Sequence, residues 1–140
     1  MTLPRLAMLA TAALLSGCVV GPRPATLSPE LQKALDTPLY CNEASECKLV
    51  WERGIYYVAN NSRWRVMAET SNLIETEYPD KGYYGLAYRI TREPMGNGRY
   101  RISTQAWCGL KDWQCKPHAD EGVARAKYYM MTGQSQDKAR

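Results

Sequence analysis

Little in this sequence of 140 residues supports catalysis. Its one histidine, His118, stands beside a predicted helix start, where a capping or surface role is the simpler interpretation. A Gly-x-Ser-x-Gly elbow, a His-Glu-x-x-His motif and a phosphate-binding glycine loop are all absent. Glu75 and Glu77 would share one face of a strand, and a carboxylate pair can hydrolyse a glycan, but two solvated surface glutamates are the simpler explanation. We therefore predict a protein that is not an enzyme and that uses no cofactor and no metal.

A strong charge imbalance is also missing. The formal net charge is +4 at pH 7, which is mild for a chain of this length. Nucleic-acid binding depends largely on clustered positive charge, so a nucleic-acid partner is not expected. The sequence has no low-complexity tract and no repeat at the period of a solenoid. These absences leave one small domain as the expected folded part.

The start of the chain carries a targeting signal. Arg5 is followed by an apolar run over residues 6–15, which is too short for a membrane span of about 20 residues. The run ends in Leu15-Ser16-Gly17-Cys18, which resembles the lipobox of bacterial lipoproteins. The resemblance implies that a signal peptidase removes residues 1–17 and that Cys18 carries a diacylglycerol, usually with a further acyl chain such as palmitate. An ordinary signal peptide that happens to end near a cysteine is the alternative.

The lipobox resemblance also implies a location. Val19 follows Cys18, where enteric lipoproteins retained in the inner membrane have aspartate. By that family rule the protein is anchored in the outer membrane and faces the periplasm, with the membrane as a partner through the lipid on Cys18. Residues 41–129 resemble the small cysteine-containing lipoproteins of Gram-negative bacteria, a resemblance that transfers no activity.

Residues 18–38 are predicted to form a proline-rich tether, with prolines at positions 22, 24, 29 and 38. Inside it, Ser28-Pro29-Glu30 is typical of a helix start, and Leu27, Leu31 and Leu35 follow at a spacing of four. A helix this short is not stable alone. We expect it to dock on its own domain, with docking on a partner as the alternative.

Four cysteines remain once Cys18 is assigned to lipid. An even number in an oxidising compartment favours two disulfides, and the spacings are longer than those of zinc knuckles. Local pairing is favoured because each pair brackets a turn into a helix, while cross-pairing stays open. The four are Cys41, Cys47, Cys108 and Cys115.

The periodicities of residues 39–133 predict a single disulfide-bonded α+β domain. An apolar stripe at helical spacing predicts a helix from about Asn42 to Asn60, and Gly54 within it suggests that another element approaches closely. Alternating patterns predict strands over residues 63–70, 73–78, 86–91 and 99–106, the last two as a hairpin. A second helix would run from about His118 to a stop at Gly133, before a frayed tail over residues 134–140. We expect a two-layer sandwich, in which both helices cover one face of a sheet of three or four antiparallel strands.

The outward positions of the predicted strands are rich in arginine. With Tyr83, Tyr84, Trp107 and Trp113 near the sheet ends, this is the composition of binding hot spots, although a solvated sheet face is the simpler alternative. The sequence therefore favours a lipid-anchored, non-catalytic binding or structural module of the cell envelope, with an envelope protein or peptidoglycan as partner. A periplasmic inhibitor of a lysozyme-like enzyme and an envelope glycan hydrolase are the alternatives. The candidate binding face comprises Arg63, Arg65, Arg89, Arg99 and Arg101.

Overall fold

The protein has the predicted α+β class in a computed structural model that describes residues 26–79, 82–111 and 114–136. None of the helices in these three ranges is long and apolar enough to cross a membrane. Cys18, residues 1–17, Trp113 and residues 137–140 lie outside the described residues. In chain order the elements are α1 (Pro29–Asp36), β1 (Leu39–Cys41), α2 (Ala44–Asn61), β2 (Val66–Glu69), β3 (Leu73–Thr76), β4 (Leu86–Gly96), β5 (Arg99–Cys108) and α3 (Ala119–Thr132).

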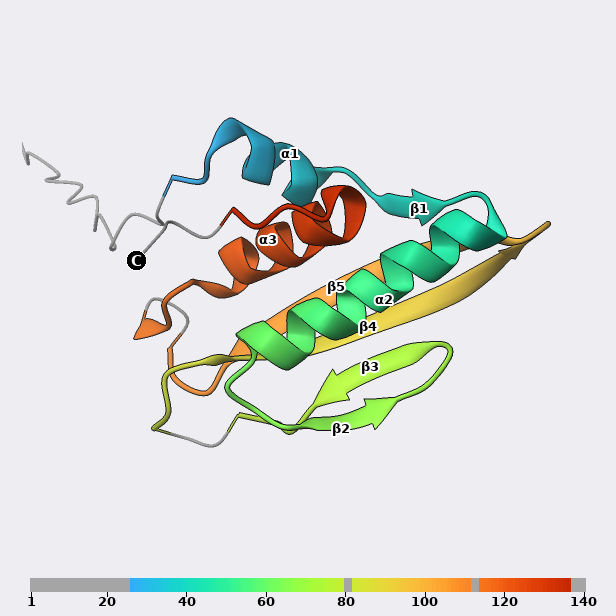
Figure 1. Cartoon of the computed structure of the whole chain (residues 1–140). Coiled ribbons are helices and arrows are strands. Elements are labelled where there is room, and N and C mark those ends of the chain that lie inside the picture. Colours follow the sequence, from blue (N-terminus) through green and yellow to red (C-terminus); the bar gives the residue numbers. More distant parts are fainter. Residues whose placement is uncertain (1–25, 80–81, 112–113, 137–140) are drawn as a thin grey trace, which may run out of the picture.

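The sheet has five antiparallel strands in the order β1-β5-β4-β3-β2 (Figure 1). The prediction of three or four strands is therefore wrong. The strand that it lacks is β1, whose three residues pair with β5 at the sheet edge. Three residues are too few to show an alternating pattern, so the sequence does not reveal this strand. The predicted β4–β5 hairpin is present and turns at Asn97 and Gly98, whose φ angles of 53° and 73° suit a two-residue turn.

The helices α2 and α3 both contact side chains that alternate on one side of β4. A Cβ placed on Gly54 of α2 would lie 3.7 Å from Ile90 and 3.0 Å from the sulfur of Met130 on α3, so this glycine does mark a close approach. A Cβ placed on Gly122 of α3 would overlap the side chain of Leu86. The two helices thus lie close to β4 because each carries a glycine where it meets a neighbouring element.

The short helix α1 docks on its own domain. It begins at Pro29 because Ser28 Oγ accepts a hydrogen bond from the Leu31 N–H at 3.3 Å. Leu31 is buried, and Nζ of Lys127 on α3 donates to the Leu35 carbonyl at 2.8 Å. Burial lowers the pKa of Lys127, and the negative charge of Asp36 partly opposes this shift. The helix therefore belongs to the folded module, although it lies within the range expected to be a tether.

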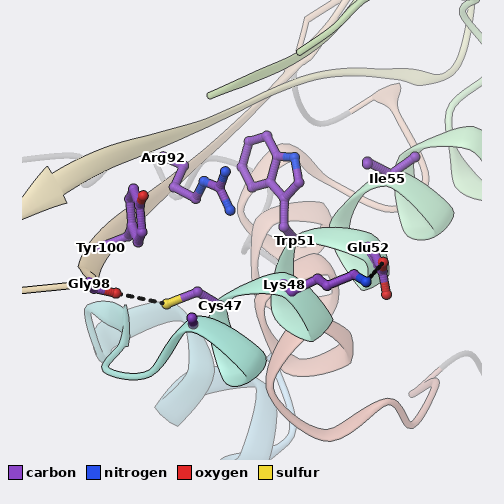
Figure 2. Close-up of a pocket in the computed structure, with 9 residues that line it drawn as sticks. Cys47, Lys48, Trp51, Glu52, Ile55, Arg92, Gly98 and Tyr100 are labelled. Atoms are coloured by element: carbon purple, nitrogen blue, oxygen red, sulfur yellow. Dashed lines mark hydrogen bonds and ion pairs between the residues drawn. The ribbon is translucent and has the colours of Figure 1, made fainter. Parts of the chain in front are cut away.

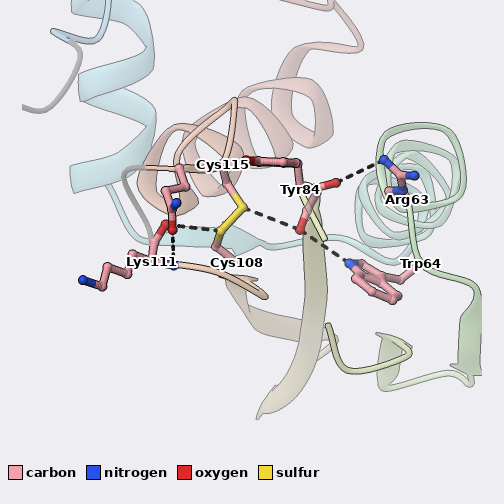
Figure 3. The surroundings of a disulfide bond; sticks show 8 residues. Arg63, Trp64, Tyr84, Cys108, Lys111 and Cys115 are labelled. Carbon is pink, nitrogen blue, oxygen red and sulfur yellow. Dashed lines mark hydrogen bonds between the residues drawn. A yellow bond between two sulfur atoms is a disulfide. The ribbon is translucent and has the colours of Figure 1, made fainter. Parts of the chain in front are cut away.

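Both predicted disulfides are present, and both pair locally. Cys41–Cys47 joins β1 to the first turn of α2, while Cys108–Cys115 closes the loop that follows β5. The second bridge lies beside Gly85, whose carbonyl oxygen is 3.8 Å from the Cys115 sulfur. Figure 3 shows the two bridged cysteines with Tyr84 nearby. The two bridges therefore stabilise different parts of the module, one at each end of β5.

Candidate functional site

Three of the five arginines predicted to form a binding face are paired with glutamates. In each pair the carboxylate comes from the neighbouring strand or from the residue next to it, and two of the pairs are directly opposed in the sheet register. The pairs are Arg65–Glu77, Arg89–Glu75 and Arg101–Glu93. The N–O distance is 3.9 Å in the first pair and 3.7 Å in the second. This face of the sheet therefore offers less free positive charge than its arginine content suggests.

The other two predicted arginines lie apart from one another. Arg63 packs against Gly85, and its guanidinium lies 5.8 Å from the centre of the Tyr83 ring. It also donates weakly to the Tyr84 carbonyl, at 3.5 Å (Figure 3). Arg99 lies at the opposite end of the sheet, beside the β4–β5 turn, in a shallow hollow of about 340 Å³. The structure thus does not bring the five arginines together into one site.

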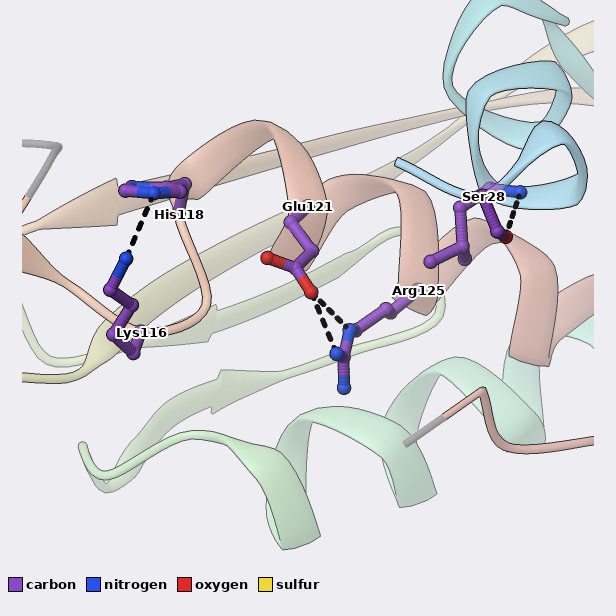
Figure 4. Close-up of polar contacts among 6 residues, drawn as sticks. Ser28, Lys116, His118, Glu121 and Arg125 are labelled. Atoms are coloured by element: carbon purple, nitrogen blue, oxygen red, sulfur yellow. Dashed lines mark hydrogen bonds and ion pairs between the residues drawn. The ribbon is translucent and has the colours of Figure 1, made fainter. Parts of the chain in front are cut away.

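The groups considered for catalysis are engaged elsewhere. Glu75 and Glu77 each face an arginine, as described above. His118 precedes α3, and its Nε2 lies 3.4 Å from Nζ of Lys116 (Figure 4). Within the described residues no cluster of histidine, cysteine, aspartate or glutamate side chains is arranged to hold a metal ion. Nothing in this part of the molecule assembles a nucleophile, a base and an oxyanion site.

Aromatic side chains gather where β4 begins and β5 ends. Tyr78, which is 71 % exposed, stacks on Trp107 with ring centres 5.9 Å apart. Trp64 meets the edge of Tyr83, and its indole N–H donates to the Gly85 carbonyl at 3.4 Å. Of the four aromatic residues predicted near the sheet ends, Tyr83, Tyr84 and Trp107 are thus confirmed in that location. Tyr83 contacts Trp64 and Trp107 contacts Tyr78, while Tyr83 and Tyr84 remain more than half exposed.

A cavity among the described residues lies between α2 and the far end of the β4–β5 hairpin (Figure 2). Its volume is about 480 Å³, in the usual range for small-ligand sites. The guanidinium of Arg92 lies between two aromatic rings, with its central carbon 4.9 Å from the centre of Trp51 and 4.6 Å from the centre of Tyr100. The Trp51 indole is held in place by a hydrogen bond of 3.2 Å to the Thr70 carbonyl. The remaining lining residues are Ala44, Cys47, Lys48, Glu52, Ile55 and Gly98.

Arg92 differs from the paired arginines because its guanidinium has no hydrogen bond or ion pair with any described residue. Its Nε is buried without a partner. An unsatisfied buried donor costs about 1–3 kcal/mol, and the two ring contacts offset this cost, since each contributes about 0.5–2 kcal/mol. The two terminal nitrogens are not buried and are directed into the cavity (Figure 2). The arrangement is a preorganised cation that can donate to an acceptor from outside the described residues.

The sequence interpretation missed this site. Arg92 follows Leu86, Tyr88 and Ile90 at a spacing of two, so it continues the series that faces the helices. The strand predicted over residues 86–91 ends one residue too early to include it. The sequence does contain a signal for the Arg92 site. A charged residue stands at an inward position of one strand, and the neighbouring strand carries a tyrosine.

No protein-family model, no curated protein and no solved structure matches the chain.

Proposed function

We propose that the protein is a lipid-anchored, non-catalytic binding module that holds an anionic group of an envelope partner in the cavity around Arg92. The observation that carries this proposal is the Arg92 guanidinium, which is stacked between Trp51 and Tyr100 and has no acceptor among the described residues. Arginine, tryptophan and tyrosine in one hollow form the composition of a binding hot spot. Because both rings hold the guanidinium before a ligand arrives, little side-chain entropy is lost on binding.

The proposed anchor is the lipid on Cys18, with the outer membrane as the proposed location. In Figure 1 the described chain enters α1 and leaves after α3 on the same side, whereas the β4–β5 turn and the start of α2 lie at the other end. The eight peptide steps from Cys18 to Thr26 span at most about 28 Å, even when fully extended. A two-layer module held in this way would turn the Arg92 cavity away from its own membrane. The proposed partner is therefore a periplasmic component, such as an envelope protein or peptidoglycan.

The anchor is tested by replacing Cys18 with alanine. We expect the Cys18→Ala protein to leave the membrane fraction, because no helix in the described ranges can span a bilayer. The measurement is membrane flotation, with the unmodified chain as the reference. If the variant floats with membranes as the reference does, lipid anchoring is wrong.

The binding role is tested by cross-linking in intact envelopes. Arg92→Gln should lose the specific partner that the unmodified chain captures. Lys111→Gln is the matched control, because it removes the same charge from an exposed residue in the loop after β5. Capture of the same partner by all three proteins would show that the Arg92 cavity is not the binding site.

A further inference from the structure

We infer that the ligand of the Arg92 cavity is the terminal carboxylate of a peptide, bound with an apolar side chain beside it. This inference rests on the proposed function and specifies the chemistry of the same site. Three features of the cavity support it: the accessible edge of the guanidinium, the net charge of the lining, and the apolar wall.

The first feature is the accessible edge. The rings of Trp51 and Tyr100 lie to either side of the Arg92 guanidinium, with their centres 4.9 and 4.6 Å from its central carbon. These two sides are therefore closed to an acceptor. The Nε side is buried, so the ligand meets the edge formed by the two terminal nitrogens. Two parallel N–H donors match the two oxygens of a carboxylate.

The second feature is the charge of the lining. Lys48 and Glu52 lie on the rim and pair with one another at 3.9 Å, which leaves Arg92 as the one unneutralised charge among the lining residues. A single positive charge suits a monoanion. A doubly charged phosphate would leave one negative charge without a partner in the cavity.

The third feature is the apolar wall. Ala44, Ile55 and the ring of Trp51 line the side of the cavity formed by α2. A free carboxylate ion would leave this wall in contact with water. A terminal residue with an apolar side chain would cover the wall and reach Arg92 at the same time, and its size suits a volume of about 480 Å³.

The test uses the mature, lipidated full chain in neutral detergent and two matched probes, acetyl-Ala-Ala-Leu with a free carboxylate and the same peptide as its amide. Titration calorimetry should show the amide binding about 10- to 100-fold more weakly, because the charge-assisted hydrogen bonds to Arg92 are lost. Arg92→Gln should reduce binding of the free acid by a similar factor. Lys111→Gln should leave it unchanged.

A conservative variant distinguishes a change in the binding site from a loss of the fold. Arg92→Lys keeps the positive charge and the far-ultraviolet circular dichroism of the fold, but a lysine cannot present a planar fork. We expect it to bind the free acid more weakly than the unmodified chain and to discriminate less between the acid and the amide. Discrimination equal to that of the unmodified chain would overturn binding through the two terminal nitrogens of Arg92.

Three further probes separate the sources of negative charge. Acetyl-Ala-Glu-Ala-amide carries only a side-chain carboxylate, inorganic phosphate is a free anion, and glycerophosphoglycerol is the soluble head group of an anionic lipid. Tighter binding of any of these than of acetyl-Ala-Ala-Leu would overturn the inference. If cross-linking to an envelope partner still depends on Arg92, the proposed function survives that result. If neither peptide binding nor cross-linking depends on Arg92, both proposals fail.

Discussion

Arg101 and Arg92 stand on opposite faces of the same β-hairpin, and their surroundings are unlike. Arg101 lies directly across from Glu93, is half exposed and forms an ion pair. Arg92 faces α2, lies between Trp51 and Tyr100, and has no acceptor among the described residues. The positive charge of Arg101, on the face open to solvent, is thus neutralised, whereas that of Arg92 in the cavity is not. The number of arginines on a face is therefore a poor guide to where an anion would bind, because only an unpaired cation gains a new partner.

The largest expected effect is a difference in the free energy of unfolding between two tryptophan variants, one on each face of the sheet. Trp51→Ala should lower the free energy of unfolding by about 3–5 kcal/mol, because Trp51 is buried and its removal leaves a cavity. Trp107→Ala, on the opposite face, should cost only about 1 kcal/mol, since Trp107 is half-buried and loses mainly its stacking on Tyr78. Urea unfolding of both variants measures the difference. Equal losses would remove the distinction between a buried wall of the cavity and an exposed aromatic pair.

The next effect compares the two disulfides. Replacing both Cys41 and Cys47 with alanine should cost about 2.4 kcal/mol, and replacing Cys108 and Cys115 should cost nearly the same, because the loops have similar lengths. Only the first pair should also weaken binding of acetyl-Ala-Ala-Leu, since Cys47 lines the Arg92 cavity. Thermal unfolding and calorimetry would separate the two consequences. Weakened binding in both double variants would indicate a general loss of fold.

A smaller effect tests the comparison between the paired Arg101 and the unpaired Arg92. A double-mutant cycle on Arg101→Ala and Glu93→Ala should give a coupling free energy of about 0.2–1 kcal/mol, as for other exposed ion pairs.

Arg92→Met should change the free energy of unfolding by less than about 1 kcal/mol, because losing the two ring contacts is offset by removing the unsatisfied Nε. Both are measured by urea unfolding. A large destabilisation by Arg92→Met would assign Arg92 a structural role instead of a binding role.

The smallest effect concerns Lys127, the buried cation between α1 and α3. Burial lowers its pKa in the folded protein, so the unfolded chain binds more protons as the pH approaches 10.5. The folded state therefore gains stability as the pH rises through the folded-state pKa towards 10.5. Urea midpoints of the unmodified chain and of Lys127→Met should show the unmodified chain gaining relative to the variant between about pH 7 and pH 10. A relative loss would mean that the Leu35 carbonyl and Asp36 outweigh the effect of burial.

Local patterns predicted much of this fold because they depend on neighbours in the sequence. The β4–β5 hairpin follows from alternation on both sides of a turn, and α1 follows from Ser28 and Pro29. The strand β1 could not be predicted, because its three residues form a strand only by pairing with β5. Which arginines of the candidate binding face have a carboxylate partner could not be predicted, for a related reason. Whether Arg89 is free depends on Glu75, and that pairing is set by the register between β3 and β4.

The α+β class, the hairpin, the helix starts and the presence of two disulfides follow from local patterns, because each depends on periodicity, turn chemistry or cysteine number. Which arginines are neutralised depends instead on how the helices and strands pack. Trp51, Arg92 and Tyr100 come from α2, β4 and β5, and they meet only when the helix packs on the sheet. An ion pair or a ring contact needs atoms within a few ångströms of one another, and that proximity is a property of packing that no local pattern contains.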